Sequence, residues 1–587
     1  MAARFHRHIL RITLNALIAL ALVTGVASGA IARHDNSAHT PSPARLLKAG
    51  AHTISGAAGI VDLAALPIAR VSAMRASLRP WARHTRLTAA EQAAYDQWAI
   101  SHPSALPAAR ALPLPKPGAN FVGGGAIPSL ASKSAGINST QSGGWYPPDQ
   151  AIAAAPGYIF VGVNNLLEVD NTSYGVKFGP WTPDQVFASV KHSGDFFSDP
   201  QITFDAERAV YLIAWLEFNP TTNHDYIDLA ISKTSSPSPL GNFYVYQVAG
   251  SVTGSDDGCD YPTLGYDYWG AYITCLTYSV STNNLTGNRL FAFSLSAMLS
   301  GALGGINYWY NIPSSTNCQT SCAPSFALSP TIEDGVPQAE WIVSTDAGYS
   351  ISSNLILCAL TNTQAIGKTS PPTMSCDINT LGTGYSNPIG ARQPGTTNTV
   401  DPGLGPKQIA YRNGRLVYTL VSAVNCNGVA EDSVTWIDTV PELTTIAANN
   451  PQLVNGINGN ATESGYICFG GTTDAYMPAI IPSGEADIAL VFNLSSAVST
   501  IYPSIAYTGR MAVDAPYTMG QGGKTAYVVQ GINSTGSSRW GDYSACALTT
   551  NLVSRGVVYC GGEFGGPNTS STSSYGWDTE LYSLRME

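Results

Sequence analysis

Aspartates recur at the points where the chain begins each copy of a repeated strand-like phrase. Burial and mutual repulsion can raise the pKa of one clustered carboxyl while another stays ionised, and the same oxygens can bind Ca²⁺. Glycoside hydrolysis uses such a pair on either side of one bond. An aspartate before a strand can instead accept backbone hydrogen bonds and fix a turn. The recurring aspartates are Asp149, Asp199, Asp260 and Asp542, with Asp401 and Asp474 a few residues before two further copies.

Asp260, Asp542 and Asp199 are the candidates for acid or base chemistry. Asp260 and Asp542 share the dipeptide Asp-Tyr, lie near a cysteine and have aromatic neighbours. The aromatic rings could stack on sugars or could pack between sheets. The candidate substrate-binding residues are Arg539, Arg510, Tyr261, Tyr543 and Trp540.

Histidine is scarce in the repeated region. Only His192 and His224 lie beyond residue 119, which argues against a His-rich zinc or iron site and leaves two residues for a Ser-His-Asp triad. A lone histidine in a loop is more often a surface residue. No cofactor is required by the sequence, Ca²⁺ is a candidate ligand of the carboxylates, and the metal content stays open.

The repeat itself predicts an all-β fold. Its seven copies start near Pro148, Pro200, Pro262, Pro330, Pro406, Pro478 and Tyr543, at steps of 52 to 76 residues. This is the period of a four-stranded β-propeller blade with loops of uneven length. Seven blades are predicted. Six are the alternative, because the copy near Met477 is loose and the last is short. A strand from residues 119–140 is expected to complete the last blade and close the ring.

Ten cysteines, all within the repeats, indicate an oxidising compartment. Pairs 259–275, 358–376 and 546–560 would each join neighbouring strands of one blade, although spacing does not fix connectivity. Cys318 and Cys322 have a spacing that metal ligands also use, but no second pair completes a tetrahedral site. The cysteines are Cys259, Cys275, Cys318, Cys322, Cys358, Cys376, Cys426, Cys468, Cys546 and Cys560.

The amino-terminal part differs from the rest. Residues 1–30 have the charged, apolar and small-residue order of a signal peptide, so we expect a secreted protein, extracellular or periplasmic, with no membrane span after cleavage. Residues 31–118 form a basic, Ala- and Pro-rich leader with one helix from about Leu87 to Pro103, either a pro-segment or tether, or a flexible linker. Residues 119–587 form the propeller. They carry 16 Lys and Arg against 35 Asp and Glu, which argues against nucleic acid as a partner.

Three phrases, SDPQITFDAERAVYLIAWLE, DDGCDYPTLGYDYWGAYITCL and RWGDYSACAL, resemble secreted bacterial proteins of the sialidase-like β-propeller superfamily over residues 140–587. Ser344, Asp346, Gly348 and Ser350 in STDAGYS resemble the Asp-box, a structural turn of that superfamily. The resemblance implies the propeller fold. The expected arginine triad and Tyr–Glu nucleophile motif are not recognisable, so sialidase activity itself is not expected.

Two functions remain open. One is a glycoside hydrolase or polysaccharide lyase that acts on an extracellular polysaccharide or glycoconjugate through carboxylates in the axial funnel. The other is a propeller without catalytic activity that binds a glycan or a protein at the cell surface. A third possibility is an envelope scaffold with bound Ca²⁺. The oligomeric state is not predicted.

Overall fold

A computed structural model describes residues 45–47, 56–69, 89–116 and, with short gaps, 127–586. The longest of these gaps are 234–241 and 313–325. The signal peptide, Cys318, Cys322 and most of the Asp-box-like segment lie outside the described residues. Among those that are described, no helix has the length and apolar character needed to cross a membrane.

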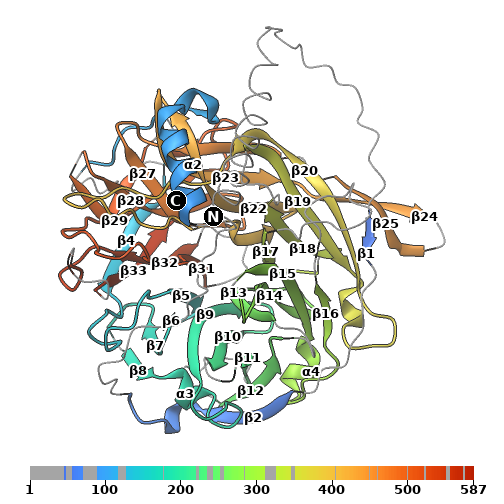
Figure 1. Ribbon diagram of the computed structural model, residues 1–587. Coiled ribbons are helices and arrows are strands. Elements are labelled where there is room, and N and C mark those ends of the chain that lie inside the picture. The colour runs from blue at the N-terminus through green and yellow to red at the C-terminus, as the bar shows by residue number, and fades with distance from the viewer. Residues whose placement is uncertain are drawn as a thin grey trace, which may run out of the picture. The chain divides into compact units, whose positions relative to one another are not determined.

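The protein is an all-β propeller, as the repeat predicts. Each copy of the phrase forms the first strand of a group of antiparallel strands, which we call units 1 to 7 in chain order. Figure 1 shows first strands such as β5, β9 and β13 near the middle and later strands such as β8 and β12 farther out. The first strands are β5 (Ala151–Ala155), β9 (Phe196–Asp205), β13 (Asp257–Tyr266), β17 (Phe326–Glu333), β21 (Lys407–Arg412), β27 (Thr473–Pro482) and β31 (Ala545–Leu548).

The later strands continue each unit outward. Units 1 and 2 add β6 (Tyr158–Val163), β7 (Leu166–Asn171), β8 (Lys177–Trp181), β10 (Val210–Asn219), β11 (His224–Ser232) and β12 (Asn242–Ala249). Units 3 and 4 add β14 (Gly270–Ser279), β15 (Leu285–Ser294), β16 (Asn307–Tyr310), β18 (Ala339–Thr345), β19 (Ser352–Thr361) and β20 (Thr373–Tyr385). Units 5 to 7 add β22 (Arg415–Cys426), β23 (Val429–Thr439), β26 (Ala461–Ile467), β28 (Ile488–Ser496), β29 (Ile501–Arg510), β30 (Ala526–Val529), β32 (Val557–Phe564) and β33 (Asp578–Arg585). A hairpin of β24 (Glu442–Ala447) and β25 (Asn450–Asn458) and the short helices α3 (Pro183–Val186) and α4 (Leu295–Leu299) lie between them.

The first strands contact one another in ring order. Each touches the next from β5 to β31, and β31 touches β5. Parallel pairing of β17 with β13 and β21 also merges units 3 to 5 into one 14-stranded sheet. Because several units share one sheet, the number of sheets does not give the number of blades. Seven blades stay a prediction, which the order of contacts supports.

The last unit is completed from the amino-terminal side. Strand β4 (Ser129–Ala135) pairs antiparallel with β33, giving the order β31-β32-β33-β4. This confirms the expected closing strand from residues 119–140. Pairing the two ends of the chain in one sheet covers an edge that would otherwise be open.

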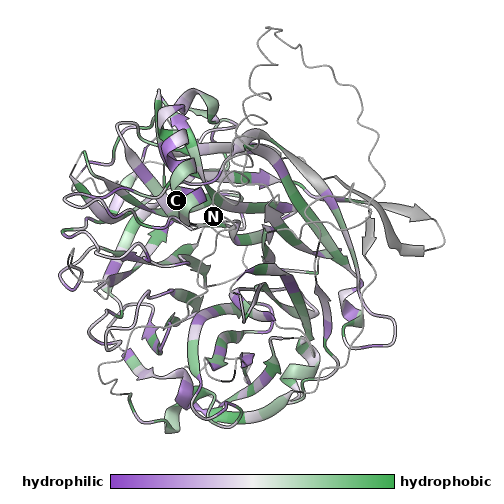
Figure 2. Ribbon diagram, in the orientation of Figure 1, coloured by the Kyte–Doolittle hydropathy of each residue, from purple (hydrophilic) through white to green (hydrophobic). Residues whose placement is uncertain are grey.

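Apolar side chains pack between neighbouring units. Phe160 of unit 1 lies in one buried cluster with Tyr211 and Trp215 of unit 2. On the other side of unit 2, Leu229 packs with Ile273 and Phe291 of unit 3. Figure 2 shows hydrophobic residues gathered along the strands of these sheets. Most aromatic residues thus hold adjacent sheets together, as expected for stacked blades.

The leader adds strands to the propeller as well as the expected helix. Helix α2 (Ala89–Ser101) confirms that helix, and Gln92 Nε2 donates a hydrogen bond to the Pro388 carbonyl at 3.0 Å. The leader strands, which the sequence did not predict, are β1 (Arg45–Leu47) on β20, β2 (Ala57–Asp62) on β12 and β3 (Ala108–Ala109) on β22. In the described part of the chain, strands β20, β12 and β22 would each have unpaired backbone groups at these positions without the leader, and a free strand edge can accept another segment.

Within the described residues, four disulfides connect strands of the units. Cys259–Cys275, Cys358–Cys376 and Cys546–Cys560 join neighbouring strands of one unit, as predicted. Cys426–Cys468 links the end of β22 to the residue after β26 in unit 5, at a sequence separation of 42.

Removing Cys426–Cys468 is expected to cost the most of the four, because it closes the longest chain segment. The chain-entropy relation gives a loss of about 4 kcal/mol in the free energy of unfolding for a loop of this length. Urea unfolding of the Cys426→Ala, Cys468→Ala double variant measures the loss. A smaller loss than that of the Cys546→Ala, Cys560→Ala variant, whose loop is 14 residues, would contradict this account.

Candidate active site

The first strands share a backbone irregularity that places the candidate residues. In units 2 to 6, a β-bulge or register shift interrupts the pairing of the first strand with the second. A bulge bends the strand and re-aims a side chain. One residue there has a positive φ in each case, and Asp149 in unit 1, two residues before β5, has one as well. These residues are Asp149, Asp199, Tyr261, Ala327, Gln408 and Met477, with φ between 33° and 58°.

Contacts between units that are not neighbours show that these bulges meet at the centre of the ring. The Tyr261 ring of unit 3 stacks on the Tyr543 ring of unit 7, with centroids 5.2 Å apart. The Tyr543 hydroxyl donates to Asp199 Oδ2 of unit 2 at 3.3 Å. The Gln408 side chain of unit 5 accepts a hydrogen bond from the Cys546 backbone N–H of unit 7 at 2.9 Å.

Three of the predicted acid–base candidates gather here, together with Asp149. The Asp542 backbone N–H donates to Asp149 Oδ1 at 2.8 Å, which ties unit 7 to unit 1. Asn164 donates to Asp149 Oδ2 at 2.6 Å and accepts from the Asp199 backbone N–H. As whole residues, Asp149, Asp260 and Asp542 are each 2% exposed, so the cluster is buried.

Arg539 supplies the positive charge of this cluster. Its Nη2 lies 2.8 Å from Asp542 Oδ2. Burial alone would lower the pKa of Arg539, but the charges of Asp542, Asp149, Asp401 and Asp260 outweigh it and raise that pKa. The Arg539 side chain keeps 23% of its surface exposed, against 3% for Asp542. Part of the Arg539 side chain therefore reaches solvent.

The electrostatics separate the roles of the carboxyls. Burial raises the pKa of Asp149 well above its usual range, and the charges of Asp542 and Asp199 raise it further. Asp542, by contrast, has a guanidinium partner. A carboxyl that holds its proton beside a carboxylate paired with arginine is the arrangement that acid–base catalysis needs.

Glu563 on β32 is a further carboxyl of this cluster. It is 3% exposed, and within the described part of the chain neither carboxyl oxygen has a hydrogen-bond partner. Burial raises its pKa well above the usual range, with the charges of Asp149 and Asp542 adding to the shift. Sequence reasoning missed Glu563 because it lies in a second strand, outside the repeated phrase.

Gly541 is expected to be intolerant of a side chain because of Glu563. A Cβ at this position would lie 2.3 Å from Glu563 Oε1, in a site with little room for the carboxyl to move. We predict that Gly541→Ala lowers the free energy of unfolding by about 1–3 kcal/mol. In the Gly541→Ala, Glu563→Ala double variant the two losses should be less than additive. If urea unfolding shows that the two losses of unfolding free energy are fully additive, Gly541 and Glu563 do not interact, and the prediction is wrong.

A cavity extends along the first strands from this cluster. It is bounded by residues of all seven units, from Gln150 and Tyr543 next to the cluster to Asp334 and Arg412 at the other end. Arg412 and Asp334 form an ion pair with each other. The cavity wall is otherwise largely apolar and amide in character, as binding sites for organic ligands commonly are.

Two loops, residues 386–406 and 530–544, contact each other, and the second loop carries Arg539 and Asp542. Gln393 Nε2 donates to the Thr535 carbonyl at 3.0 Å, and the Asp401 backbone N–H donates to the Ser538 carbonyl at 2.8 Å. Trp540 is 2% exposed and packs with Val400 and Met477. The indole, expected from sequence as a stacking surface for substrate, is therefore used in packing.

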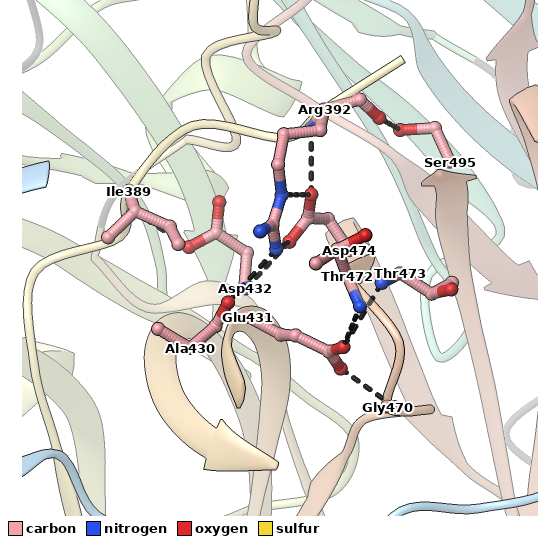
Figure 3. Close-up of polar contacts among 10 residues, drawn as sticks. All are labelled: Ile389, Arg392, Ala430, Glu431, Asp432, Gly470, Thr472, Thr473, Asp474 and Ser495. Carbon is pink, nitrogen blue, oxygen red and sulfur yellow. Dashed lines mark hydrogen bonds and ion pairs between the residues drawn. The ribbon is translucent and has the colours of Figure 1, made fainter. Parts of the chain in front are cut away.

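Arg510 and Asp474 lie in other settings. Arg510, on β29, pairs with Glu463 through Nη2 and Oε1 at 3.0 Å and is not brought to Arg539. Asp474 pairs with Arg392, whose Nη2 lies 2.7 Å from Asp474 Oδ1 (Figure 3). His224, one of the two histidines beyond residue 119, is the first residue of β11 and is exposed.

The Arg392 group in Figure 3 illustrates the structural use of carboxylates. Glu431 accepts hydrogen bonds from the backbone N–H groups of Gly470, Thr472 and Thr473. Asp432 Oδ1 accepts from the Ile389 N–H at 2.8 Å. These carboxylates fix loops by accepting backbone hydrogen bonds.

Comparisons with known proteins add little beyond the fold. No family model and no curated protein matches the chain. Among solved structures it is similar to the phage phi92 endosialidase, with 9% identity over 75% of this chain and 67% of that one and a TM-score of 0.34. It is also similar to the parainfluenza virus 5 hemagglutinin-neuraminidase ectodomain, with 8% identity over 68% and 82% and a TM-score of 0.33. For the exo-β-1,3-galactanase 1,3Gal43A from Clostridium thermocellum the identity is 10% over 75% and 95%, with a TM-score of 0.27.

Proposed function

We propose that this protein is a secreted hydrolase or lyase that acts on an extracellular polysaccharide or glycoconjugate at the axial carboxylate cluster. The observation that carries the proposal is the pairing of Asp149, a buried carboxyl with a raised pKa, with Asp542, a carboxylate held by Arg539. Their chain neighbours Gln150 and Tyr543 form part of the wall of the axial cavity.

In this proposal Asp149 is the general acid. Its proton would pass to the oxygen of the leaving sugar, while Asp542 or Asp199 acts as the base or stabilises positive charge on the ring. Arg539, whose side chain partly reaches solvent, would bind a hydroxyl or carboxylate of the substrate. Tyr261 and Tyr543 offer stacked rings beside the reacting bond, and Asp260 adds negative charge near Arg539.

Binding without catalysis is the second candidate, and one observation favours it. Asp149 and Asp199 take part in hydrogen bonds that join units 7, 1 and 2, and the loop that carries Arg539 and Asp542 contacts a second loop. Carboxylates with these contacts could serve ring closure alone. The axial cavity would then bind a ligand without cleaving it.

A panel of polysaccharides and aryl glycosides, incubated with the purified protein at pH 4 to 7, tests the two candidates. Release of reducing ends or unsaturated products supports the enzyme. Saturable binding to a glycan array with no product supports the binding protein. If the protein neither cleaves nor binds any glycan of the panel, both candidate functions are contradicted.

A further inference from the structure

A second group of titratable side chains lies in unit 2, outside the axial cluster. His192 follows helix α3, Asp195 directly precedes β9 and Glu217 lies on β10. One side-chain ligand atom from each lies within 4.8 Å of the others. His192 Nδ1 is 3.5 Å from Glu217 Oε1. Imidazole and carboxylate groups at this spacing are the common ligands of divalent transition metals.

Asp228 on β11 adjoins this group next to Glu217. In the register of β10 and β11, Glu217 pairs with Tyr226 and Trp215 pairs with Asp228, so the two acidic side chains lie on one face of the sheet. Asp228 is fully buried, and its side chain lies in hydrogen-bonding reach of Glu217 and Gln247. Burial, followed by the adjacent Glu217 carboxyl, raises the pKa of Asp228 well above its usual range.

Within the described residues, no lysine or arginine forms an ion pair with the buried carboxyl groups of Glu217 and Asp228. Glu217 and Asp228 are both 0% exposed. His192 is the basic side chain that approaches Glu217. A buried carboxylate is costly without a counter-charge, so a pair of them takes up either a proton or a cation.

Neighbouring residues hold the group in position. Gln247 Nε2 donates to Glu217 Oε2, and the His192 backbone N–H donates to Glu217 Oε1, each at 2.7 Å. The His192 ring stacks on Tyr226 at a centroid distance of 4.3 Å. Asn219 donates to Asp195. Such contacts orient ligands before a metal binds and increase its affinity.

We propose that His192, Asp195, Glu217 and Asp228 bind a divalent transition-metal cation, with Zn²⁺ preferred. One imidazole and three carboxyl groups match the nitrogen and oxygen ligands of Zn²⁺, whereas Ca²⁺ and Mg²⁺ prefer oxygen alone. The His192 side chain is 50% exposed, which gives an ion a route from solvent. Tetrahedral ligands of zinc lie about 3.3–3.6 Å apart, so the ligand atoms must close by about 1 Å, a movement that the half-exposed His192 can make.

Calorimetric titration of the metal-free full chain with ZnCl₂ and with CaCl₂ tests the site. We expect one Zn²⁺ per chain, weaker or no Ca²⁺ binding at the same site, and a rise in Tm with Zn²⁺. His192→Ala and Asp228→Asn should each weaken Zn²⁺ binding at least about tenfold. His224→Ala is the matched control, because His224 also contacts the Tyr226 ring but does not belong to the group. It should bind Zn²⁺ like the wild type.

Cobalt substitution gives a readout that does not depend on stability. Co²⁺ bound to wild-type protein should show d–d absorption that changes in His192→Ala and is unaltered in His224→Ala. The proposal is overturned if no Zn²⁺ binds, if His192→Ala and His224→Ala bind it equally, or if Ca²⁺ binds more tightly than Zn²⁺.

Discussion

Asp542→Asn is expected to lower kcat/KM for a cleaved glycan by about 10²–10⁴-fold, the usual contribution of a group in acid–base catalysis. The substitution removes the charge that pairs with Arg539 and acts beside Asp149. The backbone N–H that donates to Asp149 is retained, so the fold should persist. Initial rates at saturating and limiting substrate, together with Tm, measure both effects.

Asp474→Asn is the matched control for this prediction. Asp474 is also fully buried and also forms an ion pair with an arginine, Arg392, at 2.7 Å. It belongs to the Arg392 group, whereas Asp542 contacts Asp149 through its backbone N–H. The variant should lose stability and keep the wild-type kcat/KM. Equal losses of kcat/KM in the two variants would mean that only folding is affected and would contradict a catalytic role for Asp542.

Stability is expected to fall as the pH rises from about 4 to about 6. Burial raises the pKa of Asp96 to about 6, although a hydrogen bond from Gln92 opposes the shift. Burial also raises the pKa of Asp170 to about 6, against the charge of Lys177. Between the unfolded value of 3.8 and about 6, the folded chain binds more protons than the unfolded chain. The free energy of unfolding therefore decreases with rising pH in that window.

For a chain of this size the change corresponds to roughly 3–5 °C in Tm. Differential scanning calorimetry at pH 4 and pH 7 measures it, with the higher Tm expected at pH 4. Asp96→Asn should show a smaller difference, because it removes one of the titrating groups. A Tm that rises steadily from pH 4 to pH 7 would contradict the raised pKa values.

Periodicity in the sequence was sufficient to predict the propeller, since the repeated phrase marks each first strand. It also predicted the closing strand β4 and the disulfides that join neighbouring strands. The leader strands β2 and β3 were not predictable, because their partners lie far along the chain and their Ala-rich sequences carry no strand alternation.

The candidate site was predicted in part, for a similar reason. Asp199, Asp260 and Asp542 belong to the phrase that the propeller turns toward its axis, and the structure brings them together with Arg539, Tyr261 and Tyr543. Arg510 and Trp540 were chosen by residue type and closeness in sequence, and each has a packing or ion-pair partner elsewhere. Glu563 and the group around His192 depend on contacts across strands, which no single segment records.

The dependence of kcat/KM on pH, compared between the wild type and Asp149→Asn, tests the central claim most directly. If Asp149 is the acid, wild-type kcat/KM should fall on the alkaline side as Asp149 loses its proton, with an apparent pKa above the ordinary aspartate range. Asp149→Asn should have greatly reduced activity and lack that alkaline limb. A variant with the wild-type profile and rate would contradict the account.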